Sequence, residues 1–266
     1  MAELKIVASP EQGTSRFLSL LRLELNDSET QRLETGEQEY VINLLSGQCK
    51  ATITPAGGEA IHYAAVGNRT DIFSGPPELL YLPRESVCEL ECLQGPLAAA
   101  IYTAPTDEAA APAHIAGEQV RVITSGVSDW QRQVYIAIGA EGPATRMMVG
   151  ESDCPPGNWS SFPPHRHTAD NPPAEVEMEE LYYFQIQPSS GFAIGGIYQD
   201  PARKEESAKL AIYRHGQAFD VPDGYHFIAP CPGYRVRYTW ALGGRNRGFG
   251  AWVIDPELAW LNDFKG

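Results

Sequence analysis

Residues 155–167 read PPGNWSSFPPHRH and end in two histidines, His165 and His167, that are separated by one residue. In an extended strand, side chains two positions apart point to the same face. Both imidazole rings are therefore expected on one face, at the spacing that two ligands of a single metal ion need. A histidine in a strand is more often a surface or core residue, so the assignment depends on whether residues further along the chain supply more ligands.

Two more segments supply candidate ligands. Glu179 and Glu180 precede an expected strand at residues 181–186, where alternation lets one carboxylate face the histidines while the other points outward. Residues 221–226 read VPDGYH, and the proline and glycine turn brings His226 back over the same site. Three imidazoles and one carboxylate suit a borderline or hard divalent ion, and they leave one or two positions for water or substrate.

Around this segment the chain alternates short apolar or alternating runs with turns rich in Gly and Pro. This pattern predicts an all-β chain with two small barrels or sandwiches in tandem. We place an N-terminal domain at residues 1–105, a connector rich in Ala, Pro and Thr at 106–119, and a C-terminal domain at 120–266. The pattern predicts a helix with clear start signals at residues 255–261.

Composition excludes several classes of partner. The formal net charge of -14 does not favour binding to nucleic acid or to an anionic membrane. No apolar run approaches the ~20 residues of a membrane span, and the N-terminus lacks the basic start and apolar core of a signal peptide. We therefore expect a cytoplasmic protein. The 5 cysteines are scattered without a CxxC pair, which fits reduced thiols.

The order HxH, then Glu, then PxGxH resembles the two-part metal signature of the cupin superfamily. The surrounding sequence is similar to the 5-deoxy-glucuronate isomerases of bacterial myo-inositol catabolism and, more distantly, to the ketol-isomerase of pectin degradation. The matching segments are PGNWSS at 156–161, PPHRH at 163–167, EELYYF at 179–184 and VPDGYH at 221–226, with a weaker match at 69–83. This resemblance implies a bicupin of two tandem jelly-roll barrels, in which the second half alone holds one divalent ion, Zn or Mn.

The resemblance also implies the reaction, an aldose–ketose isomerisation of 5-deoxy-D-glucuronate to 5-dehydro-2-deoxy-D-gluconate. The ligands are then His165, His167, His226 and one glutamate. Alignment with the pectin-pathway relative favours Glu179, whereas counting back from the aromatic strand in the usual cupin manner favours Glu180. We take Glu179 as the first choice and Glu180 as the alternative. The 11 residues between His167 and Glu179 form a longer loop than in a standard cupin, which predicts a lid or rim.

This chemistry assigns further candidate residues. Proton transfer between adjacent carbons needs a base, for which the carboxylate that does not bind the metal, Glu180, is a candidate. Tyr182 and Tyr183 can relay protons, although packing in the barrel explains either of them equally well. The substrate carboxylate needs a cation, and the arginines closest in sequence to the metal strands are Arg166, Arg235 and Arg237. Because Arg166 lies between two inward histidines, we expect it to point outward.

Two other functions remain compatible with such a site, a cupin-type metal-dependent dioxygenase and a non-catalytic sugar-binding cupin. For the isomerase, the expected partner is a uronate-type sugar acid, and a homo-oligomeric state is left open. The first half offers His62 and no HxH pair, so we expect it to have a structural role. His62, His114 and His215 lack neighbouring ligands and are expected to be surface or packing residues.

Overall fold

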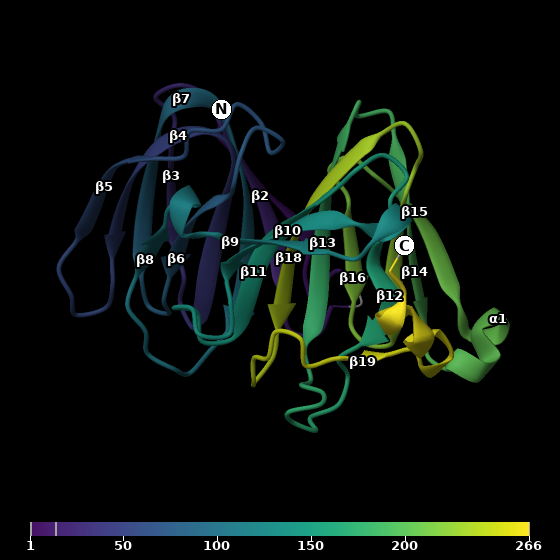
Figure 1. The fold of residues 1–266 in the computed structure, drawn as a ribbon. Coiled ribbons are helices and arrows are strands. Elements are labelled where there is room, and N and C mark those ends of the chain that lie inside the picture. Colours follow the sequence, from purple (N-terminus) through teal and green to yellow (C-terminus); the bar gives the residue numbers. More distant parts are fainter. Residues whose placement is uncertain (1, 14, 266) are drawn as a thin grey trace.

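The structure is a computed structural model that describes residues 2–13 and 15–265, and it consists mainly of antiparallel β-strands (Figure 1). The first half forms an eight-stranded sheet in which β1, β2, β7, β4, β6 and β8 are neighbours in this order, while β3 pairs with β7 and β5 with β4. Its strands are β1 (Glu3–Ala8), β2 (Ser19–Leu25), β3 (Thr30–Glu34), β4 (Gln38–Thr54), β5 (Ile61–Val66), β6 (Glu78–Leu82), β7 (Val87–Pro105) and β8 (Ala113–Ile115).

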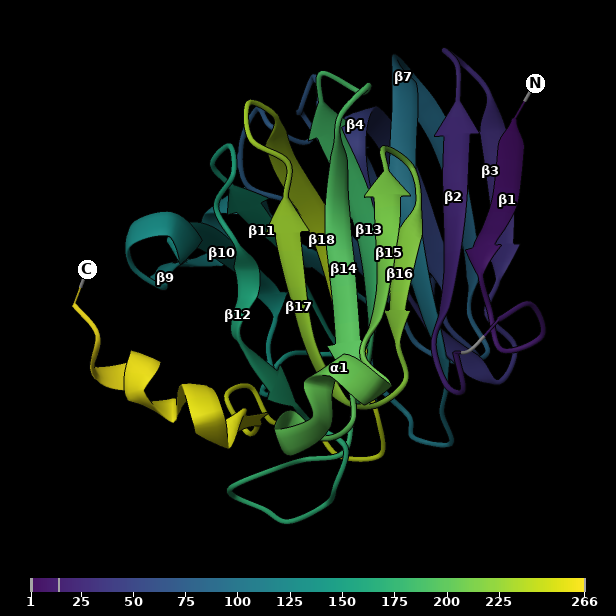
Figure 2. The same cartoon turned by 90° about the vertical axis from the view of Figure 1, so that its right-hand side faces the viewer.

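The second half forms two sheets with an apolar core between them. The six-stranded sheet contains, in spatial order, β16 (Ala218–Val221), β13 (Glu179–Gln187), β18 (Arg235–Gly243), β11 (Met147–Cys154), β10 (Arg132–Ile138) and β9 (Arg121–Ser125). The five-stranded sheet contains, in spatial order, β15 (Lys209–Arg214), β14 (Phe192–Tyr198), β17 (Tyr225–Pro230), β12 (Ser160–Arg166) and β19 (Val253–Ile254). Strands β15, β14, β17 and β12 lie side by side in Figure 2.

The helices that the structure describes are short. They are the α-helix α1 (Lys204–Ser207) and the 3-10 helices η1 (Gly117–Gln119), η2 (Ser128–Trp130), η3 (Pro201–Arg203) and η4 (Pro256–Asp263). The helix expected at residues 255–261 is η4, and the side chain of Asp255 caps it by accepting a hydrogen bond from the backbone N–H of Glu257. Part of the expected connector is strand β8, which pairs with β6 and therefore belongs to the first sheet. No helix among the described residues is both long and apolar enough to cross a membrane.

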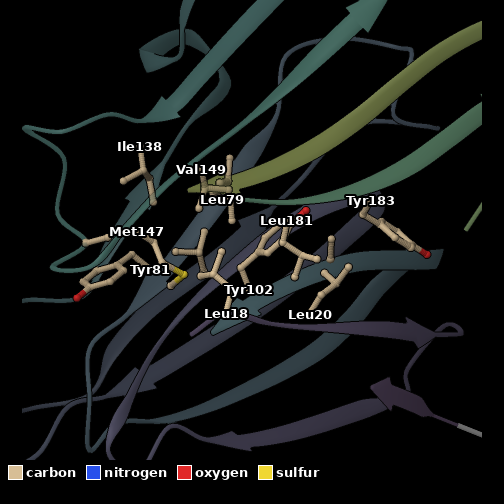
Figure 3. Packing of buried hydrophobic residues seen from close by; sticks show 14 of the residues in the cluster. Leu18, Leu20, Leu79, Tyr81, Tyr102, Ile138, Met147, Val149, Leu181 and Tyr183 are labelled. Atoms are coloured by element: carbon tan, nitrogen blue, oxygen red, sulfur yellow. The ribbon is translucent and has the colours of Figure 1, made fainter. Parts of the chain in front are cut away.

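One apolar core is shared by the two halves (Figure 3). It contains Leu20 and Tyr102 from the first half, and Leu181 and Tyr183 from β13 in the second. Tyr182, between the last two, belongs instead to the core between the two sheets of the second half. Because successive side chains of a strand alternate, β13 has one face toward the first half and one toward the interior of the second barrel.

Buried polar groups also join the halves. Glu151 of β11 is 0% exposed, and its carboxylate accepts hydrogen bonds from Arg69 at 2.9 Å and from Arg237 at 2.7 Å. Burial on its own raises the pKa of Glu151, but the two guanidinium groups outweigh burial and hold the pKa below its ordinary value. Glu39 of the first half accepts the backbone N–H of Met147 at 3.0 Å. The first half therefore supports the sheet that carries one wall of the candidate site.

Candidate metal centre

Three histidines converge inside the second barrel. His165 lies on β12 directly opposite His226 on β17, and His167 follows the end of β12. The candidate ligand atoms of the three side chains all lie within 4.8 Å of one another. The HxH spacing brings His165 and His167 to one face, and the pairing of β12 with β17 supplies the third imidazole.

The carboxylate nearest to these imidazoles belongs to Glu180. Its Oε2 atom lies 3.1 Å from Nε2 of His167 and 3.2 Å from Nε2 of His226. The carboxylate of Glu179 instead accepts the backbone N–H groups of Arg16 at 2.9 Å and Phe17 at 2.7 Å, in the first half of the chain. The expectation that put Glu179 first is therefore corrected, because alternation along β13 turns Glu179 out of the barrel and Glu180 into it.

Backbone carbonyls orient the three imidazoles. The Nδ1 atom of His165 lies 3.0 Å from the carbonyl oxygen of Pro163, that of His167 lies 2.6 Å from Met178, and that of His226 lies 3.3 Å from Gly224. A carbonyl oxygen accepts only, so each ring donates its Nδ1–H outward and turns Nε2 inward. This arrangement is typical of metal-binding histidines, whose second nitrogen is held by an outer partner. Burial lowers the pKa of His167, but the carboxylate of Glu180, 3.1 Å from its Nε2, outweighs burial and raises this pKa.

The donor atoms fit a divalent ion. Nε2 of His226 is buried and has no hydrogen-bond partner, because the oxygen of Glu180 at 3.2 Å is not aligned for a hydrogen bond. Burial, together with the neighbouring imidazoles, lowers the pKa of His165 well below its ordinary value, which keeps this ring neutral. Burial raises the pKa of Glu180, but His167 and His226 outweigh burial and lower the pKa overall, so Glu180 is a carboxylate. Imidazole nitrogens and a carboxylate are ligands for Zn, Mn and related ions, without selecting one of them.

The site opens into a cavity of about 140 Å³. One part of its wall is apolar and includes Trp240 and Trp252, while the polar part includes Tyr182 and Ser161. The Tyr182 hydroxyl lies 2.8 Å from Oγ of Ser161. Burial, and then the nearby carboxylate of Glu180, raises the pKa of Tyr182 well above its ordinary value, so the hydroxyl keeps its proton.

Two of the three expected proton-transfer groups change role. Tyr183 points into the core that the two halves share and does not line the cavity, since it lies on the opposite face of β13 from Tyr182. Glu180 lies 3.1 Å from His167 and 3.2 Å from His226, which makes it a candidate ligand rather than a free base. Tyr182 is the one of the three that both faces the cavity and lies outside the ligand set.

The three expected carboxylate-binding arginines also point elsewhere, and none of them lines the cavity that contains the histidines. Nε of Arg166 lies 3.4 Å from the carboxylate of Glu175. Arg235 donates to Asp153 at 3.0 Å, and Arg237, which is 1% exposed, donates to Glu151 at 2.7 Å. For Arg235 and Arg237 the reason is alternation on β18, where Val236 and Tyr238 face the barrel core and the two arginines face away from it. Arg166 lies between His165 and His167, and it faces away from them for the same reason.

The arginine that does line the cavity is Arg132, at the start of β10. Sequence reasoning missed it. The available signal was the alternation of Val134 and Ile136, whose side chains belong to the barrel core and share a face with Arg132. Such a signal is weak, because an arginine at the start of a strand is common on protein surfaces.

The other histidines lie outside this cluster and have local partners. His62 is exposed and lies 3.1 Å from the hydroxyl of Thr52, and His114 pairs with Glu78 at 2.6 Å. His215 accepts the backbone N–H of Ile186 at 3.2 Å. Within residues 2–13 and 15–265, His165, His167 and His226 form the one group of three or more His, Cys, Asp or Glu side chains whose ligand atoms all lie within 4.8 Å of one another.

Two tandem β-domains, the second with three histidines and a carboxylate around one point, define a bicupin with a candidate metal centre. The chain belongs to the KduI/IolB family, which it matches over residues 2–261. Both the family resemblance and the bicupin fold expected from the sequence are thereby confirmed. The domain boundaries and the metal ligands stay predictions.

Two curated relatives with the same name match nearly the whole chain. The chain is 32% identical over 260 residues to a 5-deoxy-glucuronate isomerase of Geobacillus kaustophilus, covering 97% of this chain and 90% of the relative. It is 27% identical over 259 residues to the 5-deoxy-glucuronate isomerase of Bacillus subtilis strain 168, covering 97% and 91%.

Solved structures support the fold. An IolB-like protein from Salmonella typhimurium superposes with a TM-score of 0.88 at 23% identity, covering 96% of this chain and 94% of the other. An oxalate decarboxylase of Lactobacillus farciminis gives a TM-score of 0.69 at 11% identity, covering 94% and 82%. At these identities the likeness shows the architecture alone.

Proposed function

We propose that the protein is a metal-dependent aldose–ketose isomerase that converts 5-deoxy-D-glucuronate to 5-dehydro-2-deoxy-D-gluconate. The observation that carries this proposal is the cluster of His165, His167, His226 and Glu180 at the wall of a cavity. The relatives of this chain that are named 5-deoxy-glucuronate isomerase match it over nearly their whole length, which supports the same substrate. A uronate-type sugar acid is thus the proposed partner.

His165, His167, His226 and Glu180 would hold one divalent ion, with Zn and Mn as first candidates. When bound, such an ion acts as a Lewis acid that polarises a carbonyl and stabilises negative charge on its oxygen. The Nδ1–H bonds to backbone carbonyls hold the three rings in one orientation, so little reorganisation is needed on binding.

The hydroxyl group of Tyr182 faces the cavity, where it can hold a proton or transfer it to the substrate. Because its pKa is raised, the hydroxyl stays protonated at neutral pH and acts as a hydrogen-bond donor to a substrate oxygen rather than as the initial base. Ser161, at 2.8 Å, fixes the position of this hydroxyl. The apolar side of the cavity, including Trp240 and Trp252, limits the entry of water beside the reacting carbons.

The test combines metal analysis with anaerobic turnover. Metal-loaded protein is incubated with 5-deoxy-D-glucuronate while the aldehyde proton is followed by NMR, and we expect this signal to be lost as a ketone forms. His226→Ala should lose both bound metal and turnover, whereas the matched variant His62→Ala, at an exposed histidine, should keep both.

No conversion by the metal-loaded wild type would refute the isomerase. Conversion that requires oxygen would point to a dioxygenase, and substrate binding without turnover to a sugar-binding cupin. Full activity of His226→Ala would refute the site. The cytoplasmic location and the oligomeric state stay predictions.

A further inference from the structure

Arg132 brings a positive charge to the candidate active site. It lines the same cavity as His165, His167 and Glu180. In the part of the chain that the structure describes, no carboxylate forms an ion pair with its guanidinium, whereas the three arginines expected from the sequence all have carboxylate partners. The charge of Arg132 is therefore available to a ligand.

The guanidinium is held in place by its neighbours. Its Nη1 atom donates to the backbone carbonyls of Trp130 at 3.1 Å and Phe162 at 3.5 Å. Both contacts use the same nitrogen, so neither occupies the edge formed by Nε and Nη2, which can make a planar, two-point contact. A carboxylate fits this edge with two parallel hydrogen bonds, which is the geometry that arginine recognises best.

A second cavity meets the first at Arg132. This outer cavity, of about 280 Å³, shares Ser125, Arg132, His165 and Trp252 with the cavity of the metal site. The rest of its wall is largely apolar and includes Phe264, which directly follows η4. Arg132 thus lies at the junction of the two cavities, with the histidine cluster on one side and an apolar wall on the other.

We propose that Arg132 binds the carboxylate of the sugar acid and so determines specificity for an anionic aldose. This inference rests on the proposed function, in which the aldehyde end of the substrate lies at the histidine cluster. In an open-chain 5-deoxy uronate, the carboxylate is at the opposite end, next to a carbon without a hydroxyl group. The apolar rings of Trp252 and Phe249 in the same wall suit that methylene group.

Electrostatics supports a dedicated cation at this place. The net charge of -14 repels an anionic sugar at long range, so a local positive group is needed to hold it. Within a partly closed apolar cavity, the attraction between a guanidinium and a carboxylate is stronger than at an open surface.

Binding is tested with a probe that does not react. The borohydride-reduced substrate keeps the carboxylate and hydroxyl groups but lacks the aldehyde, and the corresponding neutral hexitol lacks the charge. We expect calorimetry on metal-loaded Arg132→Gln to show binding of the reduced acid weakened about 10–100-fold, the range for losing a hydrogen bond to a charged group. Binding of the hexitol and the metal content should be unchanged. Arg132→Lys should recover part of the affinity, and Arg121→Gln, at an exposed arginine on β9, should behave as the wild type.

Turnover supplies an independent readout. For Arg132→Gln we expect KM for the uronate to rise by the same factor, with a smaller change in kcat, because the group binds the substrate far from the reacting carbons. Unchanged affinity in Arg132→Gln, equal losses for the reduced acid and the hexitol, or no binding of the reduced acid by the wild type would each overturn the inference. If the wild type binds the reduced acid through Arg132 but does not isomerise the substrate, the proposed function fails and this inference stands.

Discussion

Replacing Glu179 and Glu180 separately with Gln gives a matched pair of variants on one strand. Glu180 lies 3.1 Å from His167 and 3.2 Å from His226, whereas Glu179 accepts the backbone N–H of Phe17 at 2.7 Å. Each change keeps the shape of the side chain and removes one negative charge. We expect Glu180→Gln to lose metal affinity and Glu179→Gln to keep it.

The magnitudes follow from the two environments. Changing an outer partner of a metal ligand already lowers affinity about 10–100-fold, so loss of the anionic ligand Glu180 should cost at least about 100-fold, or about 2.8 kcal/mol. Burial raises the pKa of Glu179 to about 7, so near neutral pH this carboxyl is close to half protonated. A neutral amide can still accept the backbone N–H groups there, and the free energy of unfolding should change by less than about 1 kcal/mol.

The assay is competition for Zn or Mn against a chelating indicator, with urea unfolding of the metal-free proteins as the control for stability. Wild-type metal affinity in Glu180→Gln, together with loss of affinity in Glu179→Gln, would refute the assignment of faces on β13. Retention of metal by both variants would mean that neither carboxylate is a ligand.

Three further predictions concern the interface and the cavity. Glu151→Gln should lower the free energy of unfolding in urea by about 3–5 kcal/mol, because Arg69 and Arg237 then keep buried charges without their carboxylate. The pKa of Glu151 is lower in the folded state than its ordinary value of about 4.3, so the ionised carboxylate stabilises the fold above that pH. This contribution is lost as the pH falls through the lower folded-state pKa. The Tm of the wild type should therefore drop on acidification below about pH 4, and that of Glu151→Gln should drop less steeply. Tyr182→Phe should lower kcat about 100-fold with metal content unchanged, whereas Tyr183→Phe, in the shared core, should leave kcat unchanged.

Each of these three predictions has an outcome that would contradict it. A Glu151→Gln protein as stable as the wild type would mean that the cluster between the halves does not hold them together. Identical acid profiles for the two proteins would assign the pH dependence to other carboxylates. Equal loss of kcat in Tyr182→Phe and Tyr183→Phe would show an effect of packing rather than of a hydroxyl group in the cavity.

The three candidate metal ligands that are histidines could be predicted because their signal is local. In any strand, the spacing of His165 and His167 places both side chains on one face. The segment VPDGYH, which ends in His226, belongs to the same family signature. Apolar runs at residues 87–92 and 97–102 flank Gly95 and Pro96, and such residues predict a turn between two strands. The structure has one strand, β7, which pairs with β4 on both sides of Gly95 and Pro96 and shifts register between them. Turn residues therefore predicted an interruption that tertiary pairing overrode.

The sequence by itself determined the class of fold, the family, and three of the four candidate ligands, since each depends on patterns within a few residues. Only the tertiary structure decided which face of β13 and β18 lies inside the barrel. That choice depends on which apolar side chains the first half covers, and it placed Glu180 rather than Glu179 beside the histidines. It also paired Arg235 and Arg237 with carboxylates and left Arg132 in the cavity, because ion pairs form between strands that are distant in sequence and adjacent in space.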